Sequence, residues 1–400
     1  MRRTPRLLIV TVFLITLIIG ITLAIKYAKG YRPSFSKRTL EGTGLLAANS
    51  IPKGSTVFIN NKLTTATDDT LNLPPGEYLV KIAKDGFISW EKTIKLEPEL
   101  VTQTNARLFP AVPDLKPLTF SGVINPIPSP DGEKIVFSVA NATVDSKNGL
   151  YVLDLLNRPL SLNSSPRQIS RTSGSYNLIE AELTWSPDSN QILATLNRNK
   201  PNEINLLLNP NTFNDVANFK DVSAQLPVIN KDWQEIINNK LHEQIKELPE
   251  PMQQLATQSA KLLAFSLDEK KLLYVATASA QLPENLIPPL PASSTQLQTR
   301  QLAPNNYYIY DLEEDKNFLI AAFNELIPIH WYPDSNHVVL IETEKIIIAE
   351  SDATNRQVVY AGPFSNNFAF PWPDGSRLII MASLNGGSDL PPNFYSINLK

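Results

Sequence analysis

The chain has 400 residues, with 36 basic and 39 acidic side chains and a formal net charge of −3. It lacks the basic excess that binding to a phosphate backbone requires, so nucleic acid is not an expected partner. The absence of cysteine excludes disulfides, thiolate zinc sites and cysteine nucleophiles. With only three histidines, no metal and no cofactor are expected.

Residues 7–25 form an uncharged apolar run of nineteen residues after a short tail, residues 1–6. A helix of this length spans roughly 28 Å, enough to cross a bilayer. The run is longer than the apolar core of a cleaved signal peptide, so an uncleaved transmembrane helix is favoured over that alternative. Basic residues flank both ends, and the positive-inside rule therefore does not fix the orientation. Residues 26–42 are interpreted as a stalk.

Residues 43–110 alternate apolar and polar side chains between turn residues, which predicts a small antiparallel β-sandwich. Its turns contain Ile51-Pro52-Lys53-Gly54-Ser55, Pro75-Gly76-Glu77-Tyr78 and Gly86-Phe87-Ile88-Ser89-Trp90. This pattern resembles a PEGA domain, with Lys53 and Ser55 in place of the glutamate and alanine of the name. The resemblance implies a spacer or adhesion module that works outside the cytoplasm and has no catalytic group.

Residues 115–400 contain a repeat of the form Ser-Pro-Asp-Gly before a β-strand. Such turns need Pro to fix one backbone angle and Asp to bind nearby amides. The repeat aspartates lie 57, 80, 66 and 40 residues apart, so the units carry unequal insertions. The repeat residues are Pro130 and Asp131, Pro187 and Asp188, Asp268 (where Leu267 replaces Pro), Pro333 and Asp334, and Pro373 and Asp374.

This repeat region resembles TolB-like and WD40-like β-propellers, whose blades carry Ser-Pro-Asp-Gly between their first two strands. The whole chain is therefore expected to be mainly β: a transmembrane helix, a PEGA-like sandwich and a propeller of five blades, with six as the alternative. The last blade has only three strands before Lys400. We expect residues 115–120 to supply the fourth strand and close the ring.

Two insertions enter the third blade. Residues 231–261 have helical spacing, and Asp232 with Glu235 fits a capping box at the start of a helix. Residues 278–305 are Pro-rich and are predicted to form a loop between the second and third strands, on the face opposite the Asp turns. The residues predicted to contact a partner lie in this loop and are Leu286, Ile287, Leu290, Gln296 and Arg300.

Each candidate catalytic group also has a structural interpretation. Because the repeat aspartates recur once per blade, a role in the turn is favoured over metal binding. The acidic run from Asp311 to Asp315 is interpreted as a solvated turn, and Glu342 with Glu344 as a hairpin tip rather than a glycosidase pair. His330 and His337 flank one Asp turn and could approach each other. No Gly-x-Ser-x-Gly or phosphate-binding loop occurs.

The sequence thus favours a non-catalytic, single-pass protein of the cell membrane, with a cytoplasmic N-terminus and the bulk of the chain outside the cytoplasm. Its partner would be another envelope protein or a cell-wall glycan, bound by loops on a rigid ring. Two alternatives remain: a hydrolytic enzyme that uses the propeller channel, and an extracytoplasmic sensor whose partner supplies the output.

Overall fold

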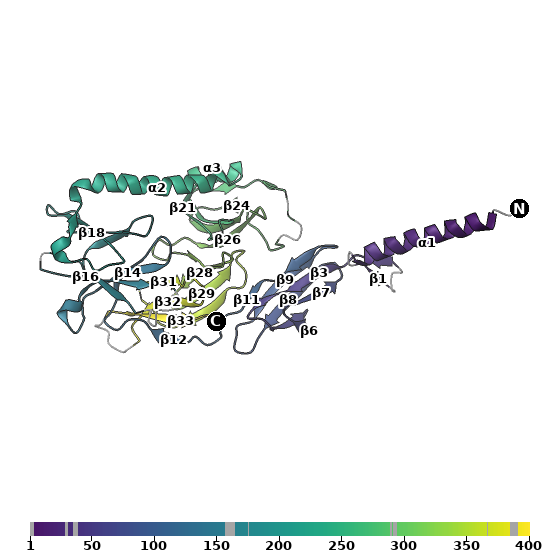
Figure 1. The fold of residues 1–400 in the computed structure, drawn as a ribbon, viewed down its shortest axis with the longest axis horizontal. Helices are drawn as coiled ribbons and strands as arrows, with labels where there is room; N and C mark the ends of the chain where they lie inside the picture. The colour runs from purple at the N-terminus through teal and green to yellow at the C-terminus, as the bar shows by residue number, and fades with distance from the viewer. Residues whose placement is uncertain are drawn as a thin grey trace. The chain divides into compact units, whose positions relative to one another are not determined.

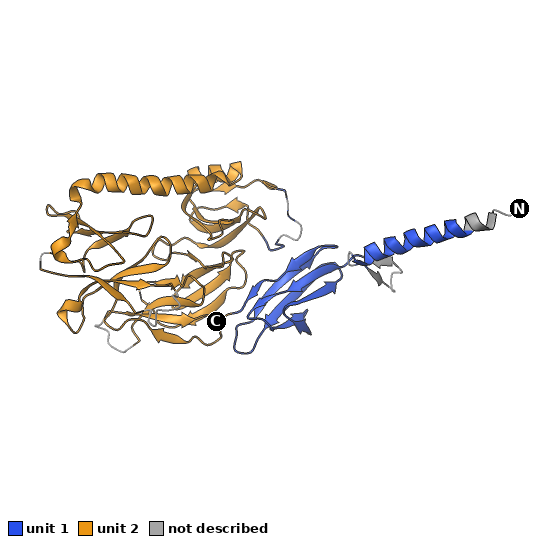
Figure 2. Cartoon of the chain, in the orientation of Figure 1, with its two compact units in different colours: residues 1–108, 288–297 blue, residues 109–287, 298–400 orange. Residues whose placement is uncertain are grey.

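The structure, a computed structural model, forms two compact units (Figures 1 and 2). Unit 1 comprises residues 1–108 and 288–297, and unit 2 comprises residues 109–287 and 298–400. The residues that the structure describes are 4–28, 31–34, 39–156, 165–174, 176–288, 290, 294–365, 367–384 and 391–400.

Unit 1 begins with helix α1 (Thr4–Ala28). Its segment Ile9–Ala28 has a mean hydropathy of 2.5, and by length and composition it is able to cross a membrane. The hydroxyls of Thr16 and Thr22 donate to the carbonyls four residues earlier, at 2.9 and 2.7 Å. These bonds satisfy two of the polar side chains within the helix, as a lipid environment requires. The short strands β1 (Arg32–Ser34) and β2 (Thr39–Glu41) pair after the helix.

The rest of unit 1 is a β-sandwich. A four-stranded sheet has the order β6-β5-β8-β9, and a three-stranded sheet has the order β10-β3-β7. Trp90, Ile94 and Leu96 alternate with exposed residues along β9 and are buried between the sheets, as the period-two pattern predicted. The strands are β3 (Gly44–Ala48), β4 (Ser50–Ile51), β5 (Thr56–Ile59), β6 (Lys62–Ala66), β7 (Asp69–Leu73), β8 (Gly76–Ala83), β9 (Trp90–Leu96), β10 (Val101–Gln103) and β11 (Ala106–Arg107).

The described part of unit 2 contains five four-stranded antiparallel sheets, which we call blades 1 to 5. Blade 1 is β13 (Ile124–Pro128), β14 (Lys134–Val139), β15 (Gly149–Asp154) and β16 (Arg167–Arg171). Blade 2 is β17 (Glu182–Trp185), β18 (Ile192–Leu196), β19 (Ile204–Leu208) and β20 (Lys220–Asp221). Blade 3 is β21 (Ala260–Phe265), β22 (Lys271–Ala276), β25 (Asn306–Asp311) and β26 (Lys316–Ala322). Blade 4 is β27 (His330–Trp331), β28 (His337–Glu342), β29 (Lys345–Glu350) and β30 (Gln357–Ala361).

Blade 5 joins the two ends of unit 2. Its strands are β31 (Ala369–Pro371), β32 (Arg377–Ala382), β33 (Asn393–Asn398) and β12 (Leu115–Pro117). Strand β12 pairs antiparallel with β33, with Lys116 opposite Ser396. The prediction that residues 115–120 supply the fourth strand of the last blade is therefore confirmed: the first strand of unit 2 completes the sheet formed by the last three.

Hydrophobic clusters join the blades in series. Separate clusters lie between blades 1 and 2, 1 and 5, 5 and 4, and 4 and 3. Within the described residues, no hydrophobic cluster joins blade 2 to blade 3. There one face of blade 3 packs against helices instead.

The helices between blades 2 and 3 are α2 (Leu226–Lys246) and α3 (Glu250–Gln258). Helix α2 runs from blade 2 to α3 along one edge of unit 2 (Figure 1). Buried side chains of the helices pack on blade 3 and on the stems of the Pro-rich loop, where β23 (Ala280–Gln281) pairs with β24 (Gln301–Leu302). The residues from the helices are Ile245, Leu248, Met252, Leu255 and Ala256.

The predicted helix boundaries are corrected. Helix α2 begins at Leu226, with Pro227 in its first turn, so Asp232 lies inside the helix and does not cap it. Proline is favoured in a first turn because the amide it lacks would have no helical partner there. Pro251 likewise lies in the first turn of α3.

Candidate functional site

The repeat aspartates cap their own turns. Asp131, Asp188 and Asp268 accept a hydrogen bond from the serine hydroxyl two residues earlier, at 2.5, 2.6 and 2.7 Å. In all five turns the aspartate also accepts the backbone N–H two residues later, at 2.8–3.2 Å. In blades 4 and 5, Tyr332 and Trp372 replace the serine.

Neighbouring turns are linked around the ring. The Asp131 N–H donates to the Ser189 hydroxyl of blade 2, and the Asp268 N–H donates to the Ser335 hydroxyl of blade 4, each at 3.1 Å. The Tyr332 hydroxyl donates to the Gly375 carbonyl of blade 5. The Asp turns therefore hold adjacent blades together on one face of unit 2.

The electrostatics of the turns agree with a capping role. The Ser186 hydroxyl, followed by the Asn190 amide, holds the pKa of Asp188 below its usual value. Burial raises the pKa of Asp374, but hydrogen bonds from Ser376 outweigh it and the net pKa is lowered. Across the described residues, no group of three or more His, Cys, Asp or Glu side chains converges as a metal site would.

Asp188→Ala is expected to lower the free energy of unfolding of unit 2 by about 1 kcal/mol, the usual net contribution of a lost turn hydrogen bond. Urea denaturation followed by tryptophan fluorescence measures it. The exposed Glu180 of the preceding connection gives a matched control, because Glu180→Ala removes a carboxylate outside the turn. A loss of partner binding by Asp188→Ala at unchanged stability would contradict the structural role.

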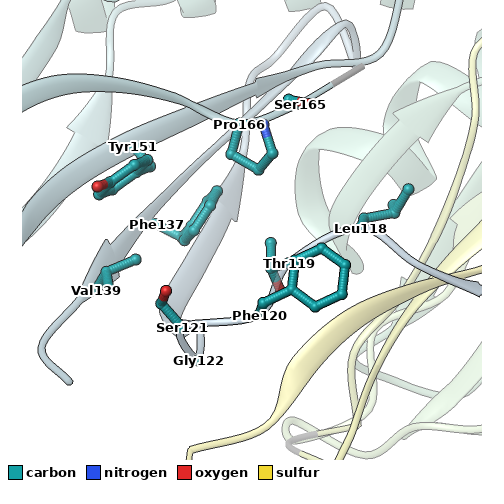
Figure 3. Close-up of a pocket in the computed structure, with 10 residues that line it drawn as sticks. All are labelled: Leu118, Thr119, Phe120, Ser121, Gly122, Phe137, Val139, Tyr151, Ser165 and Pro166. Atoms are coloured by element: carbon teal, nitrogen blue, oxygen red, sulfur yellow. The ribbon is translucent and has the colours of Figure 1, made fainter. Parts of the chain in front are cut away.

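The first candidate binding pocket lies between blades 5 and 1 (Figure 3). It has a volume of about 200 Å³. Phe137 and Tyr151 stack along one wall, with ring centroids 5.8 Å apart. The opposite rim is the connection from β12 to β13, which carries Phe120. The other lining residues are Leu118, Thr119, Ser121, Gly122, Val139, Ser165 and Pro166.

The rim of this pocket is held in one conformation. Asn393 accepts hydrogen bonds from the Thr119 hydroxyl and the Gly122 N–H, both at 3.0 Å. Gly122 has a φ of +80°, and a Cβ there would lie 2.3 Å from Pro391, so only glycine fits. The Phe120 side chain is nevertheless 80% exposed. A fixed connection that presents an exposed aromatic ring is suited to contact a partner.

A second pocket of about 410 Å³ occupies the equivalent place between blades 3 and 4. It combines the end of β28 with the connection from β26 to β27, just as the first pocket combines the end of β14 with the connection from β12 to β13. Tyr307 and Phe323 form part of its wall, with ring centroids 5.5 Å apart. Its charged groups are Glu342 and Arg356, whose side chains approach to 3.6 Å. Both pockets lie at strand ends remote from the Asp turns.

The predicted contact residues of the Pro-rich loop differ in their exposure and in the unit to which they belong. Leu290 is exposed, whereas Leu286 packs against the core of blade 3 and Ile287 is half-buried. Gln296 belongs to unit 1, where its side chain donates to the Thr93 carbonyl of β9 at 2.8 Å. Arg300 is buried and is therefore corrected from a contact residue to a structural one.

Arg300 forms a buried ion pair with Asp315, with 2.9 Å between Nη2 and Oδ1. Asp315 also accepts the Leu286 N–H at 2.8 Å and the Tyr310 hydroxyl at 2.9 Å. Arg300 donates further to the Pro283 and Asp315 carbonyls. The acidic run predicted a solvated turn, and for Asp315 this prediction is wrong, because its side chain is buried. Its ion pair with Arg300 fixes the loop stems to blade 3.

The remaining candidate groups have separate partners. The His337 ring lies 2.9 Å from the Asp334 carboxylate, whereas the His330 ring packs edge-on against Phe370 of β31 at 5.3 Å. Burial lowers the pKa of His330 to about 4. Glu342 pairs with Lys345 across the β28–β29 hairpin, and Glu344 lies in its tip, as predicted.

Sequence reasoning missed both pockets. Their lining residues come from connections between blades and from strand ends that are distant along the chain. The one available signal is an apolar side chain in a connection rather than in a strand, such as Phe120 or Phe323. Such residues do not follow the period-two pattern that identifies buried strands.

Comparisons with solved structures find propeller-containing proteins at low similarity. A protein from Agrobacterium tumefaciens assigned as TolB is 12% identical, with 69% of this chain and 78% of that one covered and a TM-score of 0.23. TolB from Acinetobacter baumannii is 13% identical, with coverages of 82% and 61% and a TM-score of 0.25. An oligogalacturonate lyase in complex with manganese is 10% identical, with coverages of 81% and 86% and a TM-score of 0.26. The fold assignment of unit 2 therefore rests on its own strand pairing.

Comparison with curated protein sequences gives no match. The family comparison does identify one part of the chain, the β-sandwich of unit 1. Residues 43–111 match the model of the PEGA domain family, which confirms the resemblance seen in the turn motifs.

Proposed function

We propose that this chain is a non-catalytic, membrane-anchored envelope protein whose unit 2 binds an extended segment of another envelope protein. The observation that carries the proposal is the pair of equivalent inter-blade pockets, each built from apolar strand ends and a connection with an aromatic side chain. A pocket of about 200 Å³ is suited to one large apolar side chain rather than to a whole ligand of drug size.

The pocket chemistry favours a protein partner over a cell-wall glycan. The walls are mainly aromatic and aliphatic, and exposed aromatic anchors dominate the energy of protein interfaces. A hydrolytic enzyme needs convergent acid and base groups. His330 lies on the first strand of blade 4, and its pKa is strongly lowered. Its ring packs against the aromatic ring of Phe370, so it gives the hydrolytic alternative no specific support.

The proposal also gives unit 1 its roles. Helix α1 anchors the chain, with the N-terminus in the cytoplasm, and the PEGA domain, which follows it in the sequence, acts as a spacer. Protease treatment of intact spheroplasts tests this orientation. Digestion of unit 2 from outside the cytoplasmic membrane is expected, and full protection in intact spheroplasts would contradict it. An extracytoplasmic sensor would have the same orientation and would in addition need an output partner.

Binding is tested by Phe120→Ser, because this side chain lies at the first pocket and its high exposure predicts little change in stability. The full chain in detergent is expected to lose about tenfold or more in affinity for its envelope partner. Val112→Ser is the matched control, since Val112 is 81% exposed and lies outside both pockets. Pull-down from solubilised envelopes, with crosslinking, measures retention.

Two outcomes would redirect the proposal. Equal capture by Phe120→Ser and Val112→Ser would remove the first pocket from the interface. Sedimentation with purified cell-wall glycan that is independent of Phe120 would favour the glycan alternative. Deleting residues 278–305 is a poor test, because it would also remove Arg300 and the buried Leu282 and Leu302.

A further inference from the structure

Strand β9 is an outer strand of the sheet β6-β5-β8-β9 in unit 1. Thr295 and Gln296 contact its outer edge; they belong to residues 294–297, here called the guard segment, which is part of the same unit (Figure 2). Gln296 Nε2 donates to the Thr93 carbonyl at 2.8 Å, and the Lys95 N–H donates to the Thr295 hydroxyl at 3.4 Å. Side chains, rather than another strand, therefore satisfy these backbone groups.

Natural proteins protect such edges because unpaired N–H and C=O groups can pair with another chain. The sequence of β9, Trp-Glu-Lys-Thr-Ile-Lys-Leu, is complementary to itself when two copies run antiparallel with Thr93 opposite Thr93. In that register Glu91 lies opposite Lys95, and Trp90 lies opposite Leu96. Opposite charges directly across two strands are stabilising, and the two-fold symmetry provides this pair twice.

The backbone geometry agrees with the same register. Thr93 and Lys95 are two residues apart, and both direct backbone groups to the outer edge, since the guard segment contacts both. In an antiparallel pair, alternate residues exchange N–H and C=O bonds with the residue opposite. Thr93 would therefore bond its counterpart, and Lys95 would bond Glu91 of the second copy.

We propose that β9 is a self-association edge, and that two copies of this chain pair antiparallel through β9, centred on Thr93, when the guard segment is released. The guard segment competes with the second copy for the same backbone groups. The occupant is another β9 strand rather than an unrelated peptide, because the charge pattern of the strand matches its own reverse.

The guard is tested in the full chain in detergent by the double variant Thr295→Ala/Gln296→Ala. Its dimer dissociation constant, from light scattering across a concentration series, is expected to fall about tenfold or more, because each copy loses the bonds that hold the guard. Leu297→Ala is the matched control: this side chain is in the same segment and is 93% exposed. Dimerisation equal to the control would overturn the guard role.

The register is tested by crosslinking, since the chain has no cysteine of its own. In the guard variant, Thr93→Cys is expected to form a disulfide between two copies, whereas Glu91→Cys alone is not. Glu91→Lys is expected to abolish dimerisation, and Glu91→Lys/Lys95→Glu to restore it. Both charge variants are made in the same guard variant. A folding defect caused by Glu91→Lys would therefore persist in Glu91→Lys/Lys95→Glu, whereas a charge clash would be relieved. Failure of Thr93→Cys to crosslink, or of the charge swap to restore pairing, would overturn the proposal.

Discussion

Arg300→Gln is expected to lower the free energy of unfolding of unit 2 by about 3–5 kcal/mol, because it leaves the Asp315 carboxylate buried without its counter-charge. Both side chains are less than one-tenth exposed, and the pair joins the loop stems to blade 3. The loss also removes the bonds to the Pro283 and Asp315 carbonyls. Urea denaturation followed by fluorescence measures it, since four of the five tryptophans lie in unit 2.

The matched control for Arg300→Gln is Lys270→Gln, which removes an ion pair next to the same β25–β26 turn. Lys270 and Glu313 are 2.7 Å apart, but both side chains are about half exposed. Exposed pairs contribute about 0–1 kcal/mol because water screens them. A similar, small effect of the two variants would show that the Arg300–Asp315 pair does not hold the loop. Arg300→Gln/Asp315→Asn should be less destabilised than the sum of the single variants.

The second large effect is a loss of stability in mild acid. Burial against Phe370 lowers the pKa of His330 to about 4, from an ordinary 6.5. Between these pH values the unfolded chain binds a proton that the folded chain excludes, so acid favours unfolding. The free energy of unfolding of unit 2 is expected to fall by about 2 kcal/mol from pH 6.5 to pH 4, less than the full shift implies because His330 as a whole residue is half-buried.

His330→Gln removes this titration, and its stability should change less than that of the wild type over the same pH range. His242→Gln provides the control, because it also removes a histidine, one that lies exposed on α2. The lowered pKa values of Asp188 and Asp374 affect the free energy of unfolding at pH values below the range from 6.5 to 4. An identical pH slope in His330→Gln and wild type would contradict the assignment.

The repeated parts of the fold could be predicted from the sequence. Each Asp turn is local, because the aspartate and the amide that it caps are two residues apart, and in blades 1 to 3 the serine lies two residues before the aspartate. Strand alternation in β9 and the missing fourth strand of blade 5 are equally visible, which is why the pairing of β12 with β33 was predictable. The PEGA turns could be recognised because Pro and Gly have fixed backbone preferences.

Contacts between distant residues could not be predicted. Asp315 lies in an acidic run, and nothing in that run shows that Arg300 returns across a loop to pair with it. Asp232 and Glu235 imitate a capping box, so the sequence predicts a helix start that is later than the observed start of α2 at Leu226. The packing of α3 on blade 3, in place of direct packing by blade 2, depends on the shape of both surfaces. The two pockets could not be predicted for the same reason, since each combines segments from neighbouring blades.

The most direct test of the account is whether the two ends of unit 2 meet in one sheet. Oxidation of Lys116→Cys/Ser396→Cys is expected to give an intramolecular disulfide and a faster-migrating band, because these residues are opposite each other on β12 and β33. Lys116→Cys/Lys400→Cys, with the second cysteine four residues further along, should remain reduced. Efficient crosslinking of the first pair alone confirms the ring of blades. Equal crosslinking of both pairs, or none, would contradict it.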